Sequence, residues 1–153
     1  NLRPESRGSV RIASPDPAAA PEIRFCFLRA DEDRGVMLAG LEMARRILRM
    51  PSLRPYVASE RSPGPDCREE QHWIAFLRDR GRSTLHPAGT CRMGVGTDAV
   101  VDPRLRVHGL ERLRVVDGSV MPLLVAANPM AATYMIAEKG ADMILADARG
   151  DAG

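Results

Sequence analysis

Apolar side chains recur at helical spacing through residues 31–50, and this pattern predicts a helix. The residues on its apolar face are Met37, Leu41, Ala44 and Leu48. Asp31 or Asp33 is expected to cap the first turn, because a carboxylate accepts hydrogen bonds from N–H groups that lack a partner within the helix. Pro51 cannot continue a helix, so the helix is expected to end before it.

The same spacing predicts a second helix over residues 66–80. Its apolar face carries Trp73, Ile74 and Leu77. Asp66 is expected to cap the start of this helix, and Gly81 is expected to end it.

A third helix is predicted from Pro129 to about Leu145. Asn128 is expected at the N-cap and Pro129 at the first helical position, where its missing N–H costs nothing. The methionines expected to fill gaps in the core are Met37, Met43, Met130, Met135 and Met143.

The remaining apolar stretches are short, as in strands. Residues 8–12 alternate polar and apolar side chains, and residues 23–28 are β-branched or aromatic at several positions. Residues 105–107 and 113–116 flank a turn at His108 and Gly109, which predicts a hairpin or a pair of strands. Together with the three helices, these strands indicate an α+β fold.

Composition excludes some classes of protein. The net charge is +2 over 153 residues, with arginines and acidic residues interspersed, so a polyanionic partner such as nucleic acid is not expected. Three cysteines at irregular spacing predict reduced thiols, which favours the cytoplasm, with the inner-membrane surface as the alternative location. The chain has no apolar run of about 18–20 residues and no signal-peptide pattern. It begins without methionine, so we expect a fragment of a longer protein.

The densest cluster of chemically useful residues lies at positions 86–94, with the sequence HPAGTCRMG. His86 precedes a proline, which favours extended backbone, and Gly89 and Gly94 allow a ligand to approach the main chain closely. Such a loop can present an imidazole to a pocket, where it would act as a general base. The alternative is an ordinary loop histidine that is hydrogen-bonded to backbone.

A second cluster lies where a strand and a turn lead into the last helix. It contains Asp117 and Gly118, followed by Asn128 and Pro129. The N-terminus of a helix exposes N–H groups and a positive dipole end, so it can hold an anion. The alternative is purely structural, with Asn128 as the N-cap and Asp117 as a turn residue.

Two other interpretations are rejected. Residues 94–99 match the loose pattern G-x-G-x-x-A, but no strand is predicted before them and no helix after them, so they do not form a dinucleotide fingerprint. Cys67 with His72, and His86 with Cys91, do not have the spacing of paired zinc ligands, so no metal site is expected.

Taken together, these clusters resemble the C-terminal signature of the glucose–methanol–choline oxidoreductase family, and within it the choline dehydrogenase-like enzymes. The matching motifs keep their order and spacing over roughly residues 59–145, which is far more specific than one motif. They are Ser59-Glu60, Pro63-Gly64-Pro65, residues 86–94, Val101-Asp102, residues 105–109, residues 113–122, residues 127–130 and residues 135–142.

The resemblance implies FAD as cofactor and oxidation of an alcohol to an aldehyde or ketone. His86 would face the flavin as base or as stabiliser of a developing alkoxide, and Asn128 would match the second catalytic position. Asp117 and Gly118 match positions that contact FAD. The expected contacts on the pyrimidine side of the flavin come from Pro129 and Met130.

The resemblance also implies how the chain is divided. Residues 1–82 would belong to a substrate-binding domain, and residues 83–153 would border the flavin and return to the FAD domain. The N-terminal G-x-G-x-x-G unit that holds the ADP half of FAD is absent, so the partners expected are this missing FAD-binding region and an alcohol. The isolated chain is expected to be inactive. The alternative is a non-catalytic binding module that self-associates into a homo-oligomer.

Overall fold

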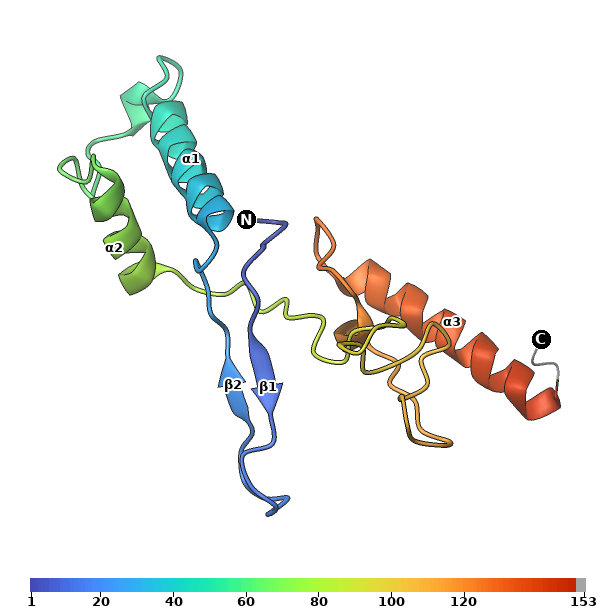
Figure 1. Ribbon diagram of the computed structural model, residues 1–153. Coiled ribbons are helices and arrows are strands. Elements are labelled where there is room, and N and C mark those ends of the chain that lie inside the picture. The colour runs from blue at the N-terminus through green and yellow to red at the C-terminus, as the bar shows by residue number, and fades with distance from the viewer. Residues whose placement is uncertain (151–153) are drawn as a thin grey trace. The chain divides into compact units, whose positions relative to one another are not determined.

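The computed structural model describes residues 1–150, and their fold is α+β, as predicted (Figure 1). The elements in chain order are β1 (Ser9–Arg11), β2 (Glu22–Arg24), α1 (Asp31–Leu48), the 3-10 turn η1 (Arg54–Tyr56), α2 (Glu70–Arg80), the 3-10 turn η2 (Gly118–Val120) and α3 (Met130–Arg149). The chain forms two compact units. The first comprises mainly residues 3–8 and 23–84, and the second mainly residues 9–22 and the chain from residue 85 onward.

Helix α1 is confirmed, but its predicted cap is wrong. Its N-cap is Ala30, and no side chain caps the first turn. Asp33 is buried instead, and its carboxylate accepts hydrogen bonds of 2.8 Å from the backbone N–H groups of Glu5 and Ser6. Glu5 and Ser6 lie 28 and 27 residues before Asp33 in sequence. The Asp33 carboxylate therefore binds a distant segment and does not cap the helix start.

Helix α2 begins later than predicted, and Asp66 does not cap it. The N-cap is Glu69, with no side-chain hydrogen bond. Arg45 explains the delay, because its guanidinium donates to the carbonyl oxygens of Cys67 at 2.8 Å and Gly64 at 3.1 Å and so holds this stretch as a turn. The predicted end at Gly81 is confirmed. The predicted apolar face is buried, and its residues are Trp73, Ile74 and Leu77.

Strands β1 and β2 pair into a two-stranded sheet, visible as a hairpin in Figure 1. Both are shorter than expected. Strand β2 stops before Cys26 and Leu28, whose φ angles of 53° and 58° leave the extended region. Gly8 must be glycine, because a Cβ there would lie 2.1 Å from the carbonyl oxygen of Arg24.

The second unit has a core of its own. Its buried residues are Val101, Leu105, Val120, Met121 and Ile136. The predicted pairing of residues 105–107 with 113–116 is confirmed as a bridge between Arg106 and Arg114, although no continuous strand forms. The turn between them contains Gly109 with a φ of 76°.

Helix α3 packs on this core and starts at Met130, with Pro129 as the N-cap. Asn128 is therefore not the N-cap, contrary to expectation. Core filling is also wrong for three methionines, since Met43, Met130 and Met135 are 47%, 67% and 56% exposed.

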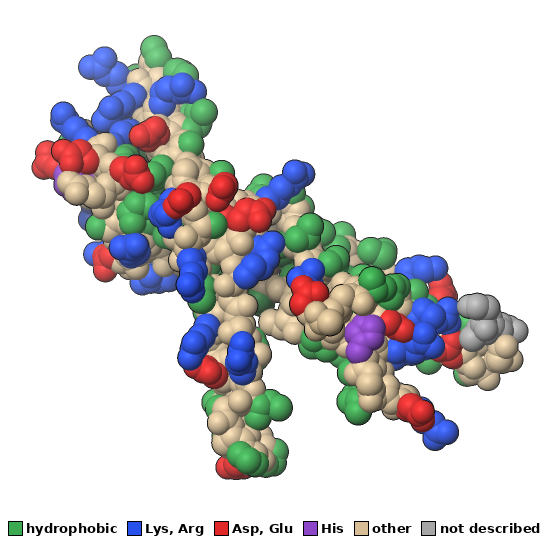
Figure 2. All heavy atoms as spheres, in the orientation of Figure 1, with side chains coloured by type: hydrophobic (Ala, Val, Ile, Leu, Met, Phe, Trp, Pro, Cys, Tyr) green, Lys and Arg blue, Asp and Glu red, His purple; other side chains and the backbone are tan. Residues whose placement is uncertain are grey.

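Charged side chains of both signs are interspersed over the visible face (Figure 2). Hydrophobic side chains also reach that face between them. In the described part of the chain, no helix is both long enough and apolar enough to cross a bilayer. Residues 1–150 also contain no group of three or more histidine, cysteine, aspartate or glutamate residues that could hold a metal ion.

Candidate functional site

The loop that carries His86 is anchored by backbone hydrogen bonds at its far end. The N–H of Cys91 donates to the carbonyl of Ser119 at 3.0 Å, and the N–H of Met93 donates to the carbonyl of Val120 at 2.9 Å. These bonds join the loop to η2 across nearly 30 residues of sequence, so the two predicted clusters lie side by side within the second unit.

The same loop is held from its other side by residues 98–108. The carbonyl of Arg92 accepts the N–H of Val100 at 2.9 Å, and its guanidinium pairs with Asp98 at 2.7 Å. Nε2 of His108 lies 3.0 Å from the carbonyl oxygen of Gly94. The stretch 91–94 is therefore fixed between two neighbours, and the segment 86–90 extends from a rigid anchor.

His86 itself is half-buried. Within residues 1–150 its imidazole has no hydrogen-bond partner. The alternative of a backbone-bonded loop histidine therefore does not describe this residue. Gly89, with a φ of +84°, brings the loop so close to Met121 that a Cβ would lie 3.3 Å from its carbonyl oxygen. The positive φ favours glycine at this position, and the close approach adds to that preference.

Asp117 and Gly118 form the turn that enters η2. The Asp117 carboxylate accepts the N–H of Ser119 at 2.7 Å, so Asp117 does serve as a turn residue. A Cβ at Gly118 would lie 3.2 Å from Oγ1 of Thr133, in the first turn of α3. Gly118 thus allows the helix start to lie close to the turn.

The start of α3 is open to solvent. Its first turn has no side-chain cap and no acidic residue. Thr133 donates to the carbonyl of Pro129 from both its N–H and its hydroxyl, each at 2.9 Å. Asn128 is exposed, and its amide has no hydrogen-bond partner in the described chain. Uncapped N–H groups at a helix start favour an electron-rich group nearby.

Bonds at Cys91 and Met93 join the His86 loop to η2, and Gly118 lies against Thr133 at the start of α3. These contacts were not evident from the sequence, and none of them involves the His86 side chain. No hydrogen bond joins His86 to Asn128. Sequence reasoning missed Thr133, which links Pro129 to the neighbourhood of Gly118. A threonine four residues after the proline was the only available signal, because threonine can bond back to the carbonyl four residues earlier.

Two carboxylates fix the frame around this site. Burial would raise the pKa of Asp102, but hydrogen bonds from Arg106 and Arg104 outweigh it and lower the pKa below its usual value. The hydrogen bond from Arg104 lowers the pKa of Asp147 as well, with Arg114 adding to the effect. Because Asp147 lies near the end of α3, its ion pairs with Arg104 and Arg114 tie that end to the loop region.

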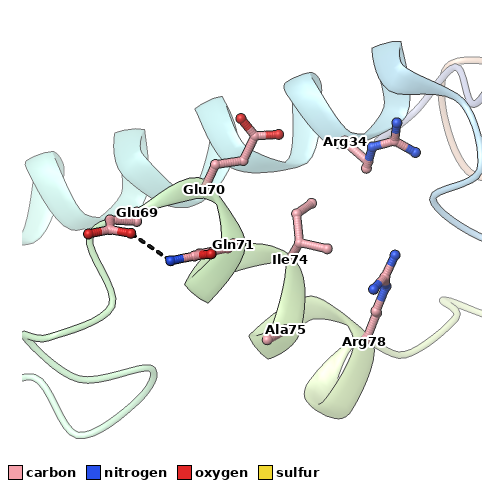
Figure 3. A pocket seen from close by; sticks show the side chains of 7 residues that line it. All are labelled: Arg34, Glu69, Glu70, Gln71, Ile74, Ala75 and Arg78. Atoms are coloured by element: carbon pink, nitrogen blue, oxygen red, sulfur yellow. Dashed lines mark hydrogen bonds between the residues drawn. The ribbon is translucent and has the colours of Figure 1, made fainter.

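A separate hollow lies between α1 and α2 in the first unit, and none of the predicted site residues lines it (Figure 3). Its lining residues are Arg34, Glu69, Glu70, Gln71, Ile74, Ala75 and Arg78. Arg34 already donates to the carbonyls of Leu28 and Arg29, and Gln71 donates to Glu69. The hollow combines both charge signs without a group poised for catalysis, so the candidate site remains the His86 loop.

Comparison with known proteins relates this chain to one family. The family model described as GMC oxidoreductase matches residues 4–137. The chain is 42% identical over 144 residues to oxygen-dependent choline dehydrogenase of Proteus mirabilis, and 42% identical to that of Chromohalobacter salexigens. The alignment covers 94% of this chain and 26% of each relative, so the chain spans about a quarter of their length.

Solved structures agree with the sequence comparison. An FAD-dependent oxidoreductase from Chaetomium thermophilum matches with a TM-score of 0.88 and 33% identity, covering 97% of this chain and 26% of that one. A pyridoxine 4-oxidase from Mesorbium loti matches with a TM-score of 0.81 and 39% identity, covering 92% and 28%. A fungal aryl-alcohol oxidase matches with a TM-score of 0.81 and 35% identity, covering 95% and 24%.

Proposed function

Because this chain belongs to the GMC oxidoreductase family, we propose that it is the C-terminal part of an FAD-dependent enzyme that oxidises an alcohol to an aldehyde or ketone. The half-buried His86 imidazole carries the proposal, since it has no hydrogen-bond partner among residues 1–150 and extends from an anchored loop. The substrates named for the relatives support the class, because choline, pyridoxine and aryl alcohols all carry a CH–OH group.

In this proposal His86 removes the hydroxyl proton of the substrate or holds it by a strong hydrogen bond. An imidazole suits the task because it titrates near neutral pH. Asn128 orients the substrate oxygen through its amide, which does not titrate in the useful range. FAD, when bound, accepts the hydride.

The chain offers features that fit the flavin. The uncapped first turn of α3, beginning after Pro129, would offer its N–H groups to an electron-rich edge of the flavin, and Met130 is exposed beside it. The turn at Asp117 and Gly118 lies close to that helix start through Thr133. These four residues are the proposed FAD contacts of this chain.

The proposal includes a missing partner region. The accessible surface of residues 1–153 is 11833 Å², whereas two separate compact bodies of half the mass would together expose about 9,200 Å². The exposed side chains include many large apolar ones, such as Ile12 at 90% and Phe27 at 63%. A two-stranded sheet is also marginal by itself. We propose that residues 1–82 complete a substrate-binding domain and that residues 83–153 complete the FAD domain.

Titration of the 153-residue chain with FAD tests this arrangement. We expect little quenching of flavin fluorescence, because the ADP half of FAD has no site here, whereas the complete protein should purify with FAD. Micromolar binding by the isolated chain, with alcohol-dependent bleaching, would contradict the arrangement.

A second candidate, a self-associating module without chemistry, is favoured by the same exposed apolar side chains. Sedimentation of the complete protein separates the two candidates. A flavin-containing protein in which these surfaces are covered within one polypeptide supports the enzyme, and a flavin-free oligomer supports the module.

A further inference from the structure

Gly140 lies in the middle of α3, where the helix closely approaches the side chain of Val116. A Cβ at this position would lie 2.4 Å from Cγ1 of Val116 and 3.3 Å from Cδ1 of Leu105. Real Cβ contacts essentially never fall below 3.0 Å. Gly35 and Gly40 in α1 differ, because a Cβ at either would meet nothing within 4 Å. The helix therefore rests on Val116 at a separation that only glycine permits.

A second contact places the same helix face against the neighbouring turn. Thr133 precedes Gly140 by seven residues, which is about two helical turns, so both point to the same side of α3. Oγ1 of Thr133 would lie 3.2 Å from a Cβ at Gly118. Val116 comes directly before the turn formed by Asp117 and Gly118. The helix thus contacts one continuous segment, residues 116–118, at two levels.

These contacts determine the spacing between two pairs of residues. Asp117 and Gly118 are on the segment, and Pro129 and Met130 are at the helix start. We infer that Gly140 is a positioning residue, whose missing side chain sets the separation of these two FAD-contacting pairs. The inference rests on the proposed function. Glycine is otherwise unfavourable in a helix interior, so the close approach accounts for its place there.

Hydrogen exchange in the complete protein tests the placement without any flavin readout. In Gly140→Ala, the added methyl group pushes α3 away from Val116, and the N–H groups of Cys91 and Ser119 should exchange at least about tenfold faster. The double variant Gly140→Ala/Val116→Ala removes the opposing methyl groups and should restore slow exchange. Gly40→Ala, a helical glycine with open space around it, is the matched control and should leave both rates unchanged.

Flavin binding tests the consequence. The dissociation constant for FAD, measured on the folded fraction, should rise at least about tenfold in Gly140→Ala and return in the double variant, because the cofactor contacts would be misplaced by the order of an ångström. Unchanged exchange in Gly140→Ala, or no recovery in a folded double variant, would overturn the inference. A lower melting temperature with unchanged FAD affinity would also overturn it, because the role would then be structural only. If the unaltered complete protein bound no FAD, the proposed function would fail, and hydrogen exchange would still decide the placement.

Discussion

Arg45 holds the loop between α1 and α2, and in Arg45→Met the first unit should unfold at a much lower denaturant concentration. Its guanidinium bonds to Glu60 at 2.6 Å and to the carbonyls of Gly64 and Cys67, and its central carbon lies 4.3 Å from the centroid of the Trp73 ring. The side chain is only 15% exposed. Four interactions that are mostly shielded from water therefore depend on one residue.

The expected loss follows from these contacts. Removing one member of a largely desolvated ion pair costs about 3–5 kcal/mol, because its partner stays behind without compensation. The stacking on Trp73 adds about 1 kcal/mol. Since Glu60 is 23% exposed and recovers some hydration, Arg45→Met should lower the free energy of unfolding by about 3 kcal/mol. Arg45→Lys keeps the charge but loses the planar fork, so it should recover only part of the loss.

Urea unfolding followed by Trp73 fluorescence measures the effect. Trp73 is the only tryptophan in the 153-residue chain, so the signal reports the first unit alone. A loss of about 3 kcal/mol lowers the midpoint by about 1–3 M urea at usual m-values. Arg46→Met on the exposed side of α1 is the matched control and should change stability by less than about 0.5 kcal/mol. A loss below about 1 kcal/mol for Arg45→Met, or equal losses for both variants, would show that Arg45 does not hold this loop.

Three further predictions concern stability. Burial opposes ionisation of Asp33, but hydrogen bonds from Ser6, Glu5 and Asn1 outweigh it and lower its pKa below 3.8. The stabilisation by the Asp33 carboxylate is therefore complete above about pH 4 and is lost as the pH falls through the lowered pKa. Asp33→Asn should flatten the acid dependence of stability in a fluorescence titration, and an unchanged curve would contradict this prediction. Asp147→Asn should weaken the pairs with Arg104 and Arg114 and speed amide exchange at the end of α3, whereas unchanged exchange would exclude a tethering role. Val101→Ala, at a position with 0% exposure, should cost about 2 kcal/mol in thermal unfolding, and a neutral result would mean that the core relaxes around the cavity.

Helix positions could be predicted from the sequence, because apolar residues recur at helical spacing. Helix α2 buries its predicted apolar face, whereas the buried residue of α1 is Asp33. The caps could not be predicted. A cap contributes only about 1 kcal/mol, so tertiary contacts override it. Asp33 bonds to the distant N–H groups of Glu5 and Ser6, and Arg45 holds the segment in which Asp66 was expected to start a helix.

The sequence supplied the candidate residues of the site but not the contacts between the segments that carry them. The motif of residues 86–94 identified His86, and turn chemistry identified Asp117. The bond from Cys91 to Ser119 joins the two segments that carry them, and no local spacing encodes it. The contact of Gly140 with Val116 could not be predicted either, because a glycine within a helix does not indicate which side chain packs against it.

Anaerobic reduction of the flavin tests whether His86 serves hydride transfer from an alcohol, as proposed. The complete protein would be mixed with choline, pyridoxine and benzyl alcohol in separate stopped-flow experiments, and bleaching of the flavin absorbance recorded. We predict that at least one alcohol reduces the flavin and that His86→Ala slows this step at least about 100-fold at unchanged flavin content. Reduction at a near-normal rate in His86→Ala, with flavin bound, would contradict the claim.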